Sequence, residues 1–250
     1  MAMILVLALV LSFWLIGRAK RSKDAQETAS SGVLSAALQD IPTSAFDTVG
    51  AGSASEAPTP IPGGKPVLQD GKPRVLYIGA EFCPYCAMDR LSLVAALSRF
   101  GRFSGLEDVL SSPDEGLISN LATVTFRTSS YSSETVSFTG VETSDRFQQP
   151  LATPGEADEA IFRQFSPSGG IPFVHYGSAY ANSAPFDGTF LAGRSADQVA
   201  DELKDPASQT SQAVLGGANL ISAQICRETG GEPGSVCTSP GVVAAGKRLR

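Results

Sequence analysis

The sequence predicts an α/β domain, because stretches typical of buried strands alternate with stretches typical of helices from residue 74 onward. Residues 75–78 form a short apolar, β-prone run and are expected to be the first strand. Apolar residues then recur at helical spacing from Met88 to Phe100, and Gly101 is placed to cap the end of that helix. We therefore expect a strand followed directly by a helix.

The rest of the chain continues the alternation. Two further strands are expected at residues 121–126 and 135–140, joined as a hairpin because the residues between them supply turn chemistry. Later helices are expected at residues 154–165, 195–203 and 206–227, and later strands at residues 169–174 and 178–186. The domain would occupy residues 67–205, followed by a C-terminal helical extension over residues 206–250.

The charge of the chain bears on whether it binds nucleic acid. The formal net charge is −6, and basic residues cluster only at residues 18–23 and 247–250. Because no basic patch offsets phosphate repulsion, we expect no nucleic acid partner.

Residues 1–17 form an unbroken apolar run. As a helix this run would be about 25 Å long, enough to cross a bilayer if flanking residues snorkel. A cleaved signal peptide fits less well, because a basic leading region is missing and Arg and Lys occupy the cleavage position. We therefore expect an uncleaved transmembrane anchor that places the protein in the cell membrane, with the lipid bilayer as a partner.

The domain is expected on the extracytoplasmic side, although one feature opposes this orientation. The basic residues 18–23 would hold the following chain in the cytoplasm under the positive-inside rule. A truncated or misassigned start would resolve the conflict, and sequencing the native N-terminus tests that hypothesis. Met1 found intact would count against an extracytoplasmic domain.

Residues 18–66 are rich in Ala, Ser, Thr, Gly and Pro and are expected to be a partly disordered linker. Within it, residues 33–38 and 41–49 have the potential to form helices that dock on the domain.

The motif Cys83-Pro84-Tyr85-Cys86 lies between the first strand and the first helix. Two cysteines three residues apart on a first helical turn can close a disulfide. Backbone N–H groups and the helix dipole stabilise a thiolate there and lower its pKa from the usual value of about 8.5. Pro84 suits a first turn. We assign Cys83 as the exposed attacking nucleophile and Cys86 as the resolving thiol.

Pro172 is expected to be a cis-proline opposite the cysteines. It would turn the Ile171 backbone toward the site, where extended substrate could pair with it, and keep metal from the thiolates. The alternative is a trans-proline at the start of a strand. With Tyr85 exposed beside the cysteines, the predicted substrate-binding residues are Tyr85, Ile171 and Pro172.

The order of elements is strand, CxxC, helix, strand with a hairpin strand, helix, proline strand, strand and helix. This order predicts a thioredoxin-like fold with a glutaredoxin-type core, an added hairpin strand and a C-terminal helical extension. An N-terminal transmembrane helix and a flexible linker would precede it.

Several segments also resemble the bacterial and archaeal family called domain of unknown function 929. They are Leu-Tyr-Ile-Gly-Ala-Glu-Phe-Cys-Pro-Tyr-Cys-Ala at residues 76–87, Ala-Leu-Ser-Arg-Phe-Gly at 96–101, Phe-Thr-Gly-Val-Glu at 138–142, Gly-Ile-Pro-Phe-Val at 170–174 and Ala-Gln-Ile-Cys-Arg at 223–227. The resemblance covers roughly residues 32 to 246. It implies a thioredoxin-like fold, often membrane-tethered and common in actinobacteria, with no established substrate. Members often carry an acidic residue where this chain has His175.

Cys226 and Cys237 enclose a loop rich in Gly and Pro. We expect a structural disulfide, which would stabilise the fold by about 3 kcal/mol and indicates an oxidising compartment. A second redox relay that reloads Cys83 and Cys86 is the alternative. The four cysteines lack the two knuckles of a zinc site, so we expect no metal, and no cofactor. His175, the only histidine, is expected at the solvent side or rim of its strand.

These features predict a thiol–disulfide oxidoreductase that forms mixed disulfides with exported client proteins, with a membrane redox partner as a further candidate. The alternative is a thioredoxin-fold binding or chaperone module of the cell envelope with a non-catalytic CxxC. Glu81, Asp89 and Arg90 lie near the cysteines but are taken as solvated flanks of the helix.

Overall fold

The computed structural model describes residues 32–249. The predicted membrane anchor at residues 1–17, and the first part of the predicted linker, lie outside the described residues. Within residues 32–249 we find no helix with the length and apolar composition needed to cross a bilayer.

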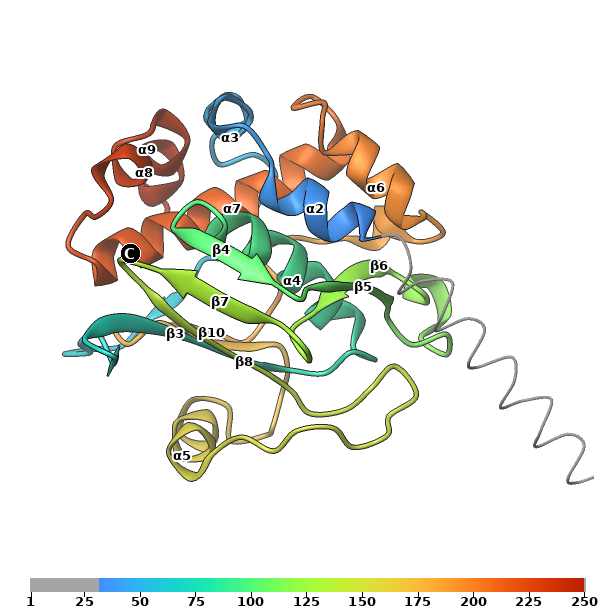
Figure 1. Cartoon of the computed structure of the whole chain (residues 1–250), viewed down its shortest axis with the longest axis horizontal. Coiled ribbons are helices and arrows are strands. Elements are labelled where there is room, and N and C mark those ends of the chain that lie inside the picture. Colours follow the sequence, from blue (N-terminus) through green and yellow to red (C-terminus); the bar gives the residue numbers. More distant parts are fainter. Residues whose placement is uncertain (1–31, 250) are drawn as a thin grey trace, which may run out of the picture.

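A mixed sheet forms the centre of the fold (Figure 1). Its strands run in the order β1, β10, β9, β3, and both β8 and β2 lie beside β3. β3 pairs in parallel with β8. The other pairs, β2 with β3, β9 with β3, β10 with β9 and β1 with β10, are antiparallel. The bounds are β1 Thr59–Pro60, β2 Leu68–Gln69, β3 Lys72–Gly79, β8 Ser137–Glu142, β9 Phe173–His175 and β10 Ala179–Ala181.

β3 occupies the middle of the sheet because its second half is apolar on both faces. Residues 75–79 are all buried, as expected for a strand that is covered on both sides. The strand predicted at residues 75–78 is therefore confirmed, with three more residues before it and one after. Its C-terminal end leads directly to the two cysteines.

Helices cover both faces of the sheet (Figure 1). On one face α4 and α7 pack side by side, with α2, α3, α6, α8 and α9 around them. On the other face α5 packs its aromatic side chains on the sheet, with the Phe162 and Phe173 ring centroids 5.3 Å apart. The bounds are α2 Val33–Gln39, α3 Thr43–Val49, α4 Pro84–Leu97, α5 Glu156–Phe165, α6 Ala196–Glu202, α7 Gln209–Glu228, α8 Gly234–Cys237 and α9 Pro240–Gly246, with short 3₁₀ helices η1 Gly116–Ile118 and η2 Thr189–Leu191.

The C-terminal helices belong to the core and are not an appendage to it. α7 packs closely against α4 at Gly217, where an added Cβ would lie 2.5 Å from Ser92 Oγ. The Ser92 hydroxyl donates to the carbonyl of Val214 at 2.9 Å, which ties the two helices together. The predicted extension at residues 206–250 is thus helical, and α7 is one of the two central helices.

The predicted hairpin between residues 121–126 and 135–140 is wrong. β6 (Ala122–Thr125) pairs with β5 (Glu107–Leu110), and β8 joins the central sheet in parallel with β3. The residues expected to turn form β7 (Ser130–Ser133), which pairs with β4 (Gly101–Ser104). The chain between the two predicted strands is thus occupied by a strand with its own partner.

Gly101 does not cap α4, which ends at Leu97 and is followed by Ser98 at its C-cap. Gly101 opens β4 instead, and an added Cβ there would lie 2.2 Å from the carbonyl oxygen of Ser132. The glycine is therefore explained by the close approach of β7.

The prediction of a linker is wrong for the segment that forms α2 and α3. Leu34 and Leu38 of α2 are fully buried, and Phe46 of α3 is 2 % exposed. The Asp108 carboxylate accepts the backbone N–H groups of Leu34 at 3.0 Å and Ser35 at 2.8 Å. These helices are part of the folded domain, as their helical potential suggested.

Replacing Asp108 by Ala is expected to lower the free energy of unfolding by about 1–3 kcal/mol, because two buried N–H groups lose a charged acceptor. Urea denaturation followed by circular dichroism measures this change. Asp108→Asn keeps one acceptor oxygen, so its free energy of unfolding should lie between those of the parent and of Asp108→Ala. A loss below about 0.5 kcal/mol for Asp108→Ala would mean that α2 does not depend on this contact.

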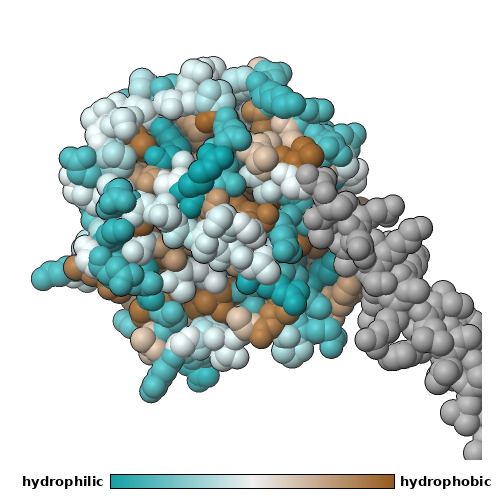
Figure 2. All heavy atoms as spheres, in the orientation of Figure 1, coloured by the Kyte–Doolittle hydropathy of each residue, from teal (hydrophilic) through white to brown (hydrophobic). Residues whose placement is uncertain are grey.

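On the face of the molecule seen in Figure 2, hydrophobic residues occur in small patches separated by hydrophilic ones. Such scattered apolar residues are typical of a solvent-facing surface.

Candidate functional site

Cys83 lies where α4 begins. It is the N-cap residue, Pro84 is the first helical residue, and Cys86 ends the first turn. The backbone N–H of Cys86 donates to Cys83 Sγ at 3.3 Å. A sulfur atom in this position is surrounded by the unpaired N–H groups of a helix start, which stabilise negative charge.

The two thiols have opposite acidities. The pKa of Cys83 is lowered to about 7, first by a hydrogen bond with the Cys86 side chain and further by the Cys86 N–H and the charge of Arg90, against the effect of burial. The pKa of Cys86 is raised well above its usual value, first by burial and then by Cys83. At neutral pH Cys83 is therefore substantially a thiolate, whereas Cys86 remains a thiol.

Cys83 is 6 % exposed and Cys86 is fully buried. The prediction of an exposed nucleophile is thus wrong, although Cys83 is the more accessible of the two. The Cys83 thiol donates to the carbonyl oxygen of Ile171, which is 3.8 Å from Cys83 Sγ. The neighbouring Tyr85, by contrast, is 55 % exposed, as predicted.

The Ile171–Pro172 peptide bond is cis, which confirms that prediction. The hydrogen bond from Cys83 to the Ile171 carbonyl shows that this turn faces the cysteines. The structure therefore brings Cys83, Ile171 and Pro172 together, with Tyr85 on the first turn of α4. Their role in binding substrate remains a prediction.

A buried group of charged side chains lies close to the cysteines. Arg90 Nη1 donates to Tyr77 Oη at 3.1 Å, to the Ala80 carbonyl at 3.1 Å and to both carboxylate oxygens of Glu142 at 3.2 and 3.3 Å. Arg90 is fully buried, and Glu142 and Asp89 are each 2 % exposed. The expectation that Asp89 and Arg90 are solvated flanks is wrong. Glu81 is also buried and accepts from Thr125 Oγ1 at 2.8 Å.

A signal for this group was present in the sequence. Every residue of α4 except Tyr85 is buried, and apart from Asp89, Arg90 and Ser92 the helix carries mainly apolar residues around its whole circumference. Charged residues within such a helix have to be paired, because an isolated buried charge is very costly. Asp89 and Arg90 could have been recognised on this basis as buried, although their partners could not.

Burial shifts the acidity of both carboxyl groups. It raises the pKa of Asp89 to about 8, against the lowering effect of Arg90 and with a further increase from Cys83. It raises the pKa of Glu142 to about 7, although Arg90 again opposes the shift. Asp89 Oδ2 has no hydrogen-bond partner among the described residues. Asp89 is therefore largely protonated at neutral pH.

His175 is buried, which corrects the expectation that it lies at the solvent side or rim. Its ring stacks on Phe165, with centroids 5.5 Å apart, and lies 6.4 Å from Phe173. Burial, followed by the charge of Arg74, lowers the pKa of His175 to about 4. The ring is therefore neutral at pH 7 and serves the packing of α5 on the sheet.

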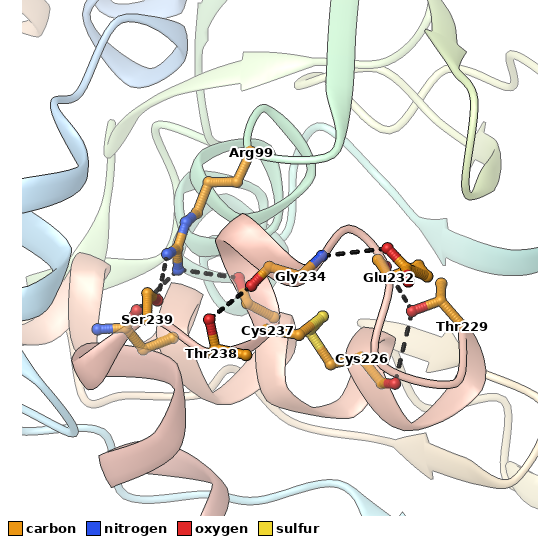
Figure 3. The surroundings of a disulfide bond; sticks show 10 residues. Arg99, Cys226, Thr229, Glu232, Gly234, Cys237, Thr238 and Ser239 are labelled. Carbon is orange, nitrogen blue, oxygen red and sulfur yellow. Dashed lines mark hydrogen bonds between the residues drawn. A yellow bond between two sulfur atoms is a disulfide. The ribbon is translucent and has the colours of Figure 1, made fainter.

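Cys226 and Cys237 form the predicted disulfide, with an S–S distance of 1.97 Å (Figure 3). Arg99, which follows the end of α4, donates to Ser239 Oγ and Asn219 Oδ1, both at 2.9 Å, so the disulfide loop lies at this end of the helix. Cys83 lies at the other end, and the 14 residues of α4 span about 21 Å. This separation excludes direct exchange between the two cysteine pairs in this conformation and favours a structural role.

Replacing both Cys226 and Cys237 by Ser is expected to lower the free energy of unfolding by about 3 kcal/mol, because the unfolded chain loses a short closed loop. Denaturant titration of the oxidised parent and of the double variant measures the difference. Reaction of Cys83 with an alkylating reagent should be unchanged in the variant. An altered reaction would instead indicate coupling between the two pairs.

No group of three or more His, Cys, Asp or Glu side chains in residues 32–249 is arranged to hold a metal ion. The site consists of two thiols, a proline turn and the buried charges near them.

Comparison with known proteins gives one match. The family model described as "Domain of unknown function (DUF929)" matches residues 63–189, a segment that includes both cysteines of the motif and Pro172. No curated protein matches, and no solved structure matches.

Proposed function

This chain belongs to the family called domain of unknown function 929, and since that name assigns no activity, we propose from the site itself that the protein is a thiol–disulfide oxidoreductase. The observation that carries the proposal is the position of Cys83 at the start of α4, where its Sγ accepts the backbone N–H of Cys86 at 3.3 Å while the Cys86 side chain is fully buried. The pKa of Cys83 is lowered to about 7, while the pKa of Cys86 is raised. A nucleophile and a resolving thiol need this difference.

We further propose that the fold is thioredoxin-like. Four observations support this: β3 is central, β8 runs parallel to it, β9 and β10 follow as antiparallel neighbours on its other side, and a cis-proline precedes β9. The position of the CxxC motif at the junction of β3 and α4 also supports a glutaredoxin-type core.

The reaction needs only sulfur chemistry. The Cys83 thiolate attacks one sulfur of a client disulfide, the client S–S bond breaks, and the other client sulfur leaves as a thiolate that takes a proton. Cys86 then loses its proton and attacks Cys83 Sγ, which releases the second client thiolate. The client gains two electrons and two protons, one proton from Cys86 and the other from solvent, and Cys83 and Cys86 are oxidised to a disulfide. The reverse sequence of steps oxidises a client dithiol. The reduction potential of the Cys83–Cys86 pair relative to that of the client decides the direction.

The clients that we propose are exported proteins. The Cys226–Cys237 disulfide supports this assignment, because structural disulfides are rare in the bacterial cytosol. We propose that residues 1–17 anchor the chain in the cell membrane with the domain on the extracytoplasmic side. A membrane redox partner would then restore the working state of Cys83 and Cys86.

Trapping tests the proposal most directly. With Cys86 replaced by Ala, Cys83 should form mixed disulfides with client proteins that accumulate, because the resolving thiol is absent. Affinity capture of the variant from cells, followed by non-reducing electrophoresis, detects these adducts. The Cys83→Ala, Cys86→Ala double variant is the control and should form none. Equal recovery from both variants, or none from either, would count against the oxidoreductase.

The rate of Cys83 alkylation should rise with pH around an inflection near 7, because only the thiolate reacts. Iodoacetamide labelling measured by mass spectrometry from pH 5 to 10 gives the curve. The single free cysteine of the Cys86→Ala variant should titrate at a higher pH, because the hydrogen bond from Cys86 is the largest cause of the shift. An inflection at or above about pH 8.5 in the parent, the ordinary pKa of a cysteine, would show that Cys83 is not an activated nucleophile.

One observation favours the alternative of a binding module with a non-catalytic CxxC, namely that Cys83 is only 6 % exposed. Redox titration separates the two functions. A reduction potential for Cys83 and Cys86 between about −120 and −270 mV supports exchange, whereas a value below about −300 mV supports a structural bridge.

A further inference from the structure

A groove of about 410 Å³ lies beside the motif. Tyr85 and Met88 of α4 form one side of it, and Ile118 of η1 contributes another. The remaining sides come from residues 55–56 and 183–189. These two segments are fixed to each other, because the N–H groups of Ser55 and Glu56 both donate to the Pro185 carbonyl, at 2.8 and 3.3 Å. The groove is therefore a built part of the domain.

The lining combines apolar surface with negative charge. Tyr85 and Ile118 supply accessible apolar surface, and the buried side chains of Met88 and Phe186 lie behind it. The exposed carboxylates of Glu56 and Asp187 supply the charge. Asp187 Oδ1 accepts the N–H of Thr189 at 3.0 Å, which fixes its carboxylate.

No lysine or arginine is among the described residues that line the groove. Arg248, close to the C-terminus, lines a separate depression together with Ser55 and Glu56. Its guanidinium donates to the backbone carbonyls of Ala54 and Ser55 and forms no ion pair with Glu56. The negative charge of the groove therefore remains available to a ligand.

We infer that this groove holds the client segment next to the reacting cysteine and selects segments that carry an apolar and a basic side chain. The inference rests on the proposed function. Tyr85 is two residues from Cys83, and an extended client advances about 3.3 Å per residue, so side chains close in sequence to the client cysteine reach the groove. Opposite charges across such a contact increase the rate of association and suppress wrong partners.

Activated peptides test the inference on the reduced full chain. Each peptide carries one cysteine as a mixed disulfide with thionitrobenzoate and a leucine beside it. Three versions place lysine, glutamine or glutamate at the two next positions. The Cys83 thiolate attacks the peptide sulfur, the S–S bond to the aromatic group breaks, and thionitrobenzoate leaves with the electron pair and is measured by its absorbance. Cys86 then releases the peptide thiol and closes the Cys83–Cys86 disulfide.

Each rate is divided by the rate of the same peptide with dithiothreitol, which removes intrinsic differences in reactivity. The lysine peptide should react about 10-fold faster than the glutamate peptide at low ionic strength, and salt should reduce the difference. The variant Glu56→Gln, Asp187→Asn should bring the ratio close to one. Glu134→Gln is the matched control and should keep the ratio, because this exposed carboxylate lies beside Ser133, whose carbonyl binds Lys72 at the end of β3 remote from Cys83.

The outcomes are distinguishable. Failure of the reduced chain to react with any peptide would contradict the proposed function itself. Reaction at equal normalised rates, or a charge preference that survives Glu56→Gln with Asp187→Asn, would overturn the groove inference and leave the proposed function standing.

Discussion

Replacing Asp89 by Asn is expected to stabilise the reduced protein increasingly as the pH rises, by about 4 kcal/mol between pH 5 and pH 8. Asp89 is 2 % exposed and its pKa is raised to about 8, whereas the same group in an unfolded chain titrates near 3.9. The folded state thus binds this proton more tightly. The stability that it contributes is complete below pH 4 and is lost as the pH rises through 8, at about 1.4 kcal/mol per unit.

Denaturant unfolding at several pH values gives the free energy of unfolding of the parent and of Asp89→Asn. In the difference between the two values, the contributions of titrating groups common to both proteins cancel. This cancellation matters because Cys83 acts in the opposite direction. Its pKa is lowered to about 7, so it adds stability as the pH rises from 7 to its unfolded value of about 8.5. A difference that stays constant from pH 5 to pH 8 would show that Asp89 is ionised throughout this range.

The fold was predictable wherever an element carries its own pattern. β3 and α5 appear where periodicity and turn residues placed them, and β9 and β10 overlap the predicted strands but are shorter, with β9 beginning at Phe173. The partner of β6 was not predictable, because Glu107–Leu110 begins with two acidic residues and has no apolar strand pattern of its own. Pairing is decided by tertiary packing, which local sequence does not report.

The two N-terminal helices show the same limit. α2 and α3 have seven residues each, too few to be stable alone, and their Ala, Ser and Thr content is also typical of a linker. Burial of Leu34, Leu38 and Phe46 in the core stabilises them. That burial depends on surfaces formed by residues far along the chain, such as Asp108.

At the candidate site the motif itself predicted the position of Cys83 at a helix start and the cis bond before Pro172. The burial of Cys83 was missed, because it depends on the Ile171 carbonyl, 88 residues away in sequence. The pairing of Arg90 with Glu142 was missed for the same reason. Glu142 reaches Arg90 only because β8 runs parallel to β3 and places Glu142 opposite Gly79, at the end of the strand that precedes the cysteines.

This placement connects stability with the acidity of the nucleophile. Replacing Arg90 by Met is expected to lower the free energy of unfolding by about 3–5 kcal/mol, because Glu142 is left buried without its counter-ion. The carbonyl of Ala80 and the hydroxyl of Tyr77 lose the same donor. The effect is best measured near pH 8, because the pKa of Glu142 in the parent is about 7, raised by burial against the lowering effect of Arg90, so the parent's ion pair is complete at that pH.

The double variant Arg90→Met, Glu142→Gln is the matched control. It removes both charges and should recover much of the loss, because removing a whole buried pair costs far less than removing one partner. Both proteins should show the Cys83 alkylation inflection at a higher pH than the parent, since the charge of Arg90 is one cause of the lowered pKa. If Arg90→Met destabilises the fold while leaving the inflection in place, the helix start and the Cys86 hydrogen bond alone maintain the thiolate.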